Sequence, residues 1–198
     1  FLPGLREVLQ QRGKNYAYAP KFYGSLRPTD WYRVFKILRK SRTAAITEFQ
    51  GLSCRDYWQM LCFVLGYPRE VLRFMKTLGV SRQDQLLRHA LWVAFDRVAL
   101  RHYVRYLFGK RLARSGVSSI CCISWYENKS GEKNFYRGLR SVAGKSRIYG
   151  AHLFVWPESM LNLHPDANEI EFDLVPDRIL FNGPYYLPEP SHLNCSVG

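Results

Sequence analysis

The stretch VSSICCISWYENKSGEKNFYRGLRSVAGKSRIYGAHLFVW, residues 117–156, decides the fold. It starts with an almost uncharged apolar run over residues 117–125, which is typical of a strand buried on both faces. A short amphipathic helix is predicted over residues 133–142, and a second buried strand over residues 147–156. A strand, a helix and another strand in this order predict parallel strands joined by a helical crossover.

The rest of the chain extends this pattern. A third short strand is predicted over residues 178–182, after an irregular acidic segment at 157–177 that contains three prolines. The helices predicted in the first part cover residues 2–12, 29–40, 53–66, 68–79 and 81–113, and short strands are predicted at 14–19 and 43–49. An unbroken helix over 81–113 would be about 50 Å long, so a break is expected within it. The predicted class is α/β, a Rossmann-like parallel sheet with flanking helices and a helix-rich first half.

A length of 198 residues fits one domain. We predict a single α/β domain over residues 1–187, helix-rich over 1–115 and sheet-rich over 116–187, with a linker or tail at 188–198. The chain starts with Phe1, so it is expected to be a piece of a longer protein. Its longest apolar stretch is interrupted by charges, which predicts no membrane-spanning helix.

Positive charge is concentrated in the first part of the chain. Residues 1–115 hold 22 Lys and Arg against 7 Asp and Glu, a balance of +15, whereas residues 116–198 hold 7 against 9, a balance of −2. Such asymmetry indicates an anionic partner: nucleic acid, an anionic membrane surface or a polyanionic substrate. The basic residues alternate with aromatic and aliphatic ones, which favours a membrane or substrate surface over a flexible nucleic-acid-binding arm. Every fourth residue is basic at Arg97, Arg101 and Arg105, a stripe that either is solvated or contacts phosphates.

Candidate site residues follow from the predicted sheet, because open parallel sheets bind ligands beyond the carboxyl ends of their strands. Glu48, Glu127 and Asn182 each follow or close a predicted strand. His152 comes within the second predicted strand, just after Gly150, where a glycine would permit close approach to the backbone.

Glu127 is the principal catalytic candidate. Aromatic neighbours, Trp125 among them, would partly desolvate its carboxylate, which suits a general base. Asn128 would orient that carboxylate or bind a substrate hydroxyl. A structural alternative remains open, in which Glu127 caps the following helix or pairs with Arg137 or Arg140.

The other candidates complete the predicted site. His152 and His164 are the histidines best placed for a catalytic or binding role, and Glu48 with Glu127 would supply the carboxylate pair of glycosidic chemistry. The predicted substrate-binding residues are Trp125, Asn128, Arg137, His164 and Asn182. Five cysteines without C-x-x-C spacing predict neither a disulfide framework nor a metal site. Phosphate-binding, dinucleotide-binding and hydrolase glycine motifs are also absent, so no bound cofactor is expected.

Four segments carry a resemblance to a known family: SWYEN at 124–128, FYRGLR at 135–140, IYGAH at 148–152 and PDRILFNGP at 176–184. Together they resemble bacterial surface-polysaccharide glycosyltransferases of the GT-B type. The similarity is to the acceptor-side domain, including the group that adds Kdo sugars to capsule or lipopolysaccharide. It covers about the last 80 residues.

The resemblance implies a sugar transfer from a nucleotide-sugar donor, for example a CMP-sugar, to a glycan or lipid-linked glycan. Glu127 would be the catalytic acid or base, and His152 would lie near the site. The resemblance also implies a cytoplasmic protein, with peripheral attachment to the inner membrane as one option, and most of the donor site in a further domain. The alternative is a non-catalytic basic α/β module that binds nucleic acid or another polyanion.

Overall fold

The structure, a computed structural model, describes residues 4–20, 27–40, 44–93, 97–152 and 165–180. Within these ranges the chain forms seven helices and a three-stranded parallel sheet, which confirms the predicted α/β class. Where the sequence predicts one domain over residues 1–187, the chain divides into two compact units, Phe1–Gly51 and Leu52–Gly198. The predicted tail at 188–198 lies outside the described residues.

The first unit contains two helices, α1 (Leu5–Gln11) and α2 (Pro28–Lys40). The strands predicted at 14–19 and 43–49 are wrong for the residues described there. These form only an isolated parallel bridge between Tyr18 and Ala45, closed by two backbone hydrogen bonds of 2.8 Å. A turn begins three residues after Ala45, so the pairing cannot lengthen into a strand.

The second unit begins with three helices, α3 (Cys54–Met75), α4 (Arg82–Val93) and α5 (Arg97–Ala113). The sequence predicts that one helix ends at Gly66 and another begins at Pro68. This prediction is wrong, because α3 runs through both residues. A proline inside a helix removes one hydrogen bond, a cost that burial elsewhere along the helix can offset. Residues 81–113 contain two helices, α4 and α5, and residues 94–96 between them, where a break would fall, lie outside the described residues.

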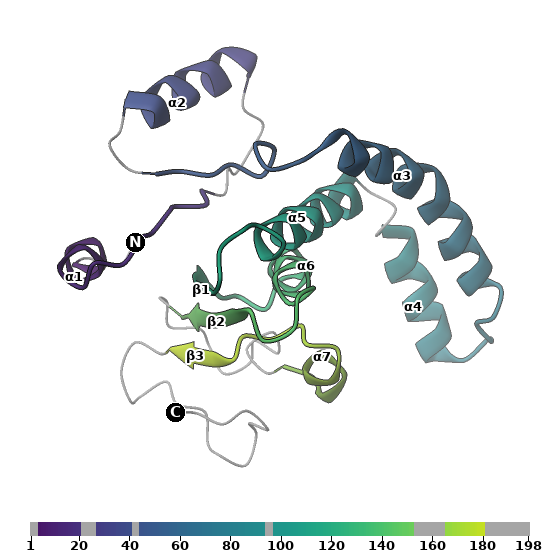
Figure 1. The fold of residues 1–198 in the computed structure, drawn as a ribbon. Helices are drawn as coiled ribbons and strands as arrows, with labels where there is room; N and C mark the ends of the chain where they lie inside the picture. The colour runs from purple at the N-terminus through teal and green to yellow at the C-terminus, as the bar shows by residue number, and fades with distance from the viewer. Residues whose placement is uncertain (1–3, 21–26, 41–43, 94–96, 153–164, 181–198) are drawn as a thin grey trace. The chain divides into compact units, whose positions relative to one another are not determined.

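The sheet follows α5, and its strands and crossovers occur in the predicted order. Its elements are β1 (Ile120–Trp125), α6 (Ser130–Leu139), β2 (Ser146–Ala151), α7 (Ala167–Glu171) and β3 (Arg178–Leu180). The strands pair in parallel in the order β1-β2-β3. Helix α7 lies in the segment predicted to be irregular, so that prediction is wrong at this point. Figure 1 shows α6 between the sheet and α5.

The core of the second unit forms where α5 packs on α6. Two glycines let these helices meet backbone to backbone. A Cβ atom added at Gly109 would lie 2.5 Å from the carbonyl oxygen of Phe135, and one at Gly138 would lie 2.9 Å from the amide nitrogen of Lys110. Around this crossing the buried apolar side chains are Val104, Leu107, Phe108, Phe135, Tyr136, Leu139 and Ile148.

A buried ion pair links α3 to α5. The Asp56 carboxylate accepts hydrogen bonds from the Ser53 amide at 2.7 Å and from Arg111 Nε at 2.6 Å, and its residue is only 5% exposed. Burial raises the pKa of Asp56, but the hydrogen bonds from Ser53 and Arg111 outweigh this effect and hold it below the ordinary value of 3.8. The pair therefore stabilises the fold in its ionised state.

Arg111→Ala is expected to lower the free energy of unfolding by about 2 kcal/mol near neutral pH, since it leaves the Asp56 carboxylate buried with one charged donor fewer. Because the folded pKa of Asp56 is depressed, its contribution is present above the unfolded pKa and is lost as the pH falls through the folded pKa. We expect the difference in free energy of unfolding between the wild type and Arg111→Ala to be smaller at about pH 3 than at about pH 7, as measured by urea unfolding. Arg114→Ala, at an exposed position, is the control.

Candidate functional site

The carboxyl ends of β1 and β2 bring buried polar side chains together. Trp125 and Ala151 pair at the last position of these strands, and the Tyr126 amide continues the ladder with a 3.1 Å hydrogen bond to the Ala151 carbonyl. The next residues are polar yet buried: Glu127 is 9% exposed and His152 is 4% exposed. Two of the predicted site residues therefore lie at this edge of the sheet.

Glu127 pairs with a lysine and not with either predicted arginine. Its carboxylate lies 2.5 Å from Lys129 Nζ, whereas Arg140 pairs with Asp177 at 2.6 Å. The capping role considered for Glu127 belongs to Glu132, whose Oε2 accepts hydrogen bonds from the amides of Glu127 at 2.9 Å and Lys129 at 3.3 Å. Glu132 therefore provides the acidic side chain of the α6 capping box.

His152 follows β2 directly and is held by its backbone, since its amide donates to the Leu180 carbonyl at 2.8 Å. The Tyr126 ring meets its imidazole edge to face, with ring centroids 5.2 Å apart. Burial lowers the pKa of His152, and the nearby charge of Glu127 opposes that shift in part. Near neutral pH the imidazole is therefore mainly neutral, the form that has one donor and one acceptor nitrogen.

Gly150 is required by the packing beneath this site. A Cβ atom at Gly150 would lie 2.7 Å from Pro176 Cγ and 2.8 Å from Tyr126 Cβ. The close approach expected at this glycine is thus made by the segment that leads into β3 and by the aromatic ring after β1. It brings Tyr126 against β2, next to His152.

Asn128 fixes the loop between β1 and α6. Its backbone φ is 55°, in the left-handed region that asparagine tolerates better than most residues. Its amide oxygen accepts from the Tyr126 hydroxyl at 3.0 Å, and its amide nitrogen donates to Glu169 Oε2 at 3.2 Å. Glu169 in turn pairs with Lys133 of α6. Both ends of the Asn128 amide therefore hold the loop in place.

Asn128→Ala is expected to unfold at a lower denaturant concentration than Asn128→Gly, by about 1 kcal/mol in free energy of unfolding. Both variants lose the two side-chain hydrogen bonds, but only glycine adopts the left-handed backbone without steric cost. Urea titration followed by far-ultraviolet circular dichroism measures the difference. Equal stability of the two variants would show that the loop does not require a positive φ at this position.

The remaining predicted site residues are dispersed. Trp125 ends β1 and is half-buried, and Arg137 is exposed on α6, about 10 Å further along the helix axis than Ser130. Glu48 belongs to the first unit, in a turn and not at the end of a strand of the sheet. His164 and Asn182 lie outside the described residues.

Residues that the sequence analysis did not select complete this edge of the sheet: Tyr126, Glu132, Lys133 and Glu169. A local signal for Glu169 was available, because an aspartate three residues before a glutamate is a capping box, and Asp166 and Glu169 form one at the start of α7. Its contact with Asn128, 41 residues earlier, had no sequence signal.

The basic stripe predicted on α5 is not a uniformly solvated face. Arg101 is exposed, but Arg105 is half-buried, with its guanidinium 5.6 Å from the centre of the Phe135 ring. Such a cation–π contact holds Arg105 against α6. Among these two arginines, only Arg101 is presented to an external anion.

Other chemical groups of the described chain offer little for catalysis. Burial raises the pKa of the Cys122 thiol to about 12 and raises the pKa of Tyr136, so neither ionises near neutral pH. No cluster of three or more metal-binding side chains and no helix long and apolar enough to cross a membrane occurs within the described ranges.

Neither a family model, nor a curated protein, nor a solved structure matches this chain.

Proposed function

We propose that this chain is the acceptor-binding half of a glycosyltransferase that transfers a sugar from a nucleotide-sugar donor to a surface-glycan acceptor. One observation carries the proposal: Glu127 and His152 come from different strands and adjoin at the carboxyl edge of a parallel sheet, where such folds bind ligands. The resemblance to the acceptor-side domain of GT-B enzymes supports it.

In this proposal Glu127 acts as the general base. It accepts the proton of an acceptor hydroxyl while that oxygen forms a bond to the anomeric carbon of the donor sugar. The bond from that carbon to the nucleotide phosphate breaks, and the phosphate leaves with the electron pair. The acceptor hydroxyl would bind the carboxylate alongside Lys129, whose ammonium lies 2.5 Å from it.

The neighbouring groups have supporting roles in this chemistry. His152 lies beside Glu127 with both ring nitrogens buried, so in this proposal its neutral imidazole shapes the site and does not contact the sugar. Asn128 and Glu169 hold the loop that carries Glu127, because a general base must be within hydrogen-bond reach of its proton. The donor nucleotide would bind in a second α/β domain, on the cytoplasmic side of the inner membrane.

The test is acceptor-dependent release of nucleotide by the full-length protein that contains this chain. A CMP-sugar is the first donor to examine, with a lipopolysaccharide-type glycan as acceptor, followed by UDP- and GDP-sugars. The proposal predicts release that requires the acceptor. Absence of release with every donor, together with salt-dependent binding of an unrelated oligonucleotide, would instead favour a polyanion-binding module, the function that the balance of +15 in residues 1–115 suggests.

A further inference from the structure

Helix α3 has a row of exposed apolar side chains along one side. The row consists of Trp58, Leu61, Leu65 and Leu72, which are 65%, 48%, 64% and 44% exposed. Their spacing of three, four and seven residues places them on one face of the helix. At 1.5 Å per residue this apolar row is about 20 Å long.

The opposite side of α3 already packs against the core of its unit. Phe63 stacks on Tyr103 of α5, with ring centroids 4.3 Å apart. Asp56, on the same side, binds Arg111 of α5. The apolar row is therefore not the core-facing side of α3, and its exposure needs another explanation.

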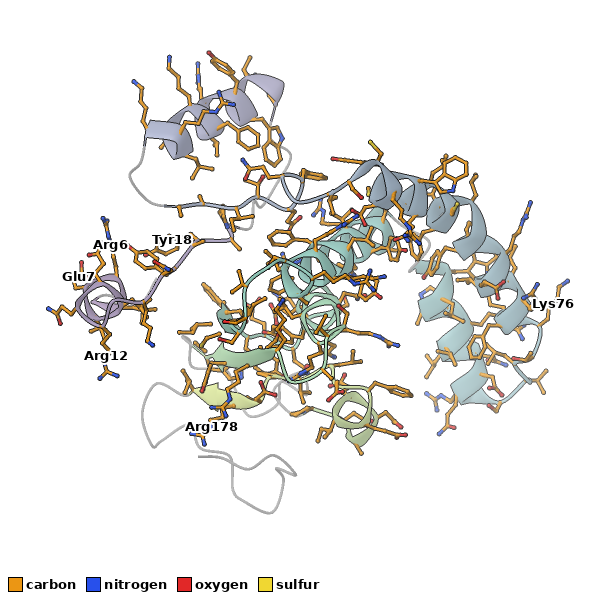
Figure 2. All side chains as sticks on the ribbon, in the orientation of Figure 1. Arg6, Glu7, Arg12, Tyr18, Lys76 and Arg178 are labelled. Carbon is orange, nitrogen blue, oxygen red and sulfur yellow. The ribbon has the colours of Figure 1, made fainter. Side chains whose placement is uncertain are left out.

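Basic side chains accompany the apolar row. Arg69 comes four residues after Leu65, and Lys76 comes four residues after Leu72, so each lies one turn from a leucine of the row. Both are exposed, and Figure 2 shows Lys76 at the end of α3. Arg55, also exposed, comes three residues before Trp58, which continues the basic edge to the start of the helix.

The acidic residues of α3 do not offset this edge. Asp56 is buried against Arg111, and Glu70 pairs with Arg73 at 2.9 Å. A second copy of α3 placed on the row would bring two basic edges together, which like-charge repulsion disfavours. An anionic partner complements the same surface.

We propose that the apolar row of α3 docks this protein on an anionic lipid bilayer. The row enters the boundary between headgroups and acyl chains, while Arg55, Arg69 and Lys76 contact lipid phosphates. Helices that lie on membranes combine these features: an apolar face with tryptophan and leucine, bordered by basic residues. The proposal goes beyond the sugar transfer proposed above, and vesicle binding tests it without any reaction.

The experiment is sedimentation of the protein with vesicles at low salt, using an equal mixture of phosphatidylcholine and phosphatidylglycerol or phosphatidylcholine alone. We expect binding to the mixed vesicles, weak binding to the neutral ones, and loss of binding as salt rises. Leu65→Glu should lower the partition coefficient about tenfold or more. It removes a leucine that the bilayer would bury and adds a negative charge that the anionic lipids repel.

Val80→Glu is the matched control, since Val80 is a 90% exposed apolar residue outside α3. It should alter the partition coefficient by no more than about twofold. Equal losses in the two variants would overturn the docking face, and equal binding to neutral and anionic vesicles would overturn the role of the basic edge. A wild-type dimer that Leu65→Glu dissociates, with no vesicle binding, would assign the row to a second copy instead.

Discussion

Gly138→Ala is expected to lower the free energy of unfolding by about 3 kcal/mol, at the upper end of what overpacking costs. The added methyl group would meet backbone atoms of α5 on several sides: the carbonyl oxygen of Tyr106, the amide nitrogen of Lys110 at 2.9 Å and Gly109 Cα at 3.1 Å. Backbone atoms of a packed helix cannot rotate away as a side chain can. The two helices must therefore separate, and the buried contacts around the crossing weaken with them.

Gly66→Ala is the control for this prediction. Gly66 also lies inside a helix, but a Cβ atom there would have no heavy atom of another part of the protein within 4 Å. Alanine should therefore stabilise α3 by up to about 1 kcal/mol through helix propensity alone. Urea unfolding of both variants and the wild type measures the contrast. If the two variants have the same free energy of unfolding, α5 and α6 do not cross at Gly138.

The sheet could be predicted from sequence because its signals are local. The continuous apolar residues of β1 and the glycine-containing run of β2 read as strands without knowledge of their partners. The parallel order follows from the helix between them, since a crossover of that length leads to a parallel neighbour. The edge at which Glu127 and His152 adjoin is a consequence of that order.

The errors arise where a local signal was overridden or overlooked. Pro68 normally ends a helix, but α3 continues because its core-facing residues, such as Phe63 and Val71, remain periodic on both sides of the proline. The sequence predicts no helix at α7, because the flanking Pro165 and Pro176 and the acidic residues around them are typical of a loop, although Asp166 and Glu169 form a capping box.

The finer organisation of the site depends on contacts between distant segments. The hydrogen bond from Asn128 to Glu169 spans 41 residues, and the pairing of Lys133 with Glu169 spans 36. No periodicity or motif encodes such distances, so the contacts of Glu169 with Asn128 and Lys133 could not be predicted from the sequence. Glu127 likewise pairs with Lys129 and not with Arg140, because Arg140 binds Asp177 from a distant part of the chain.

Under the proposed function, Glu127→Gln should lower the rate of sugar transfer about a hundredfold to ten-thousandfold, the range of a general base. Glutamine has nearly the same shape, so the fold should survive, but its amide cannot accept the proton of the acceptor hydroxyl. Among the buried acids in the described part of the second unit, Asp56 and Glu132 cap helices, whereas the Glu127 carboxylate pairs with Lys129. Its loss should therefore affect kcat far more than stability.

Glu171→Gln provides the matched control, because Glu171 is an exposed glutamate of α7 in the same unit. Its transfer rate should remain within about twofold of the wild type. Both variants should retain the far-ultraviolet circular dichroism spectrum of the wild type, which separates a chemical role from a structural one.

The most direct measurement is a single-turnover assay of the proposed sugar transfer by the full-length protein, with donor bound and acceptor in excess, for the wild type, Glu127→Gln and Glu171→Gln. The account predicts that transfer is lost about a hundredfold or more in Glu127→Gln alone. A Glu127→Gln rate equal to that of Glu171→Gln would contradict it, and would leave Glu127 as a structural partner of Lys129 at the end of β1.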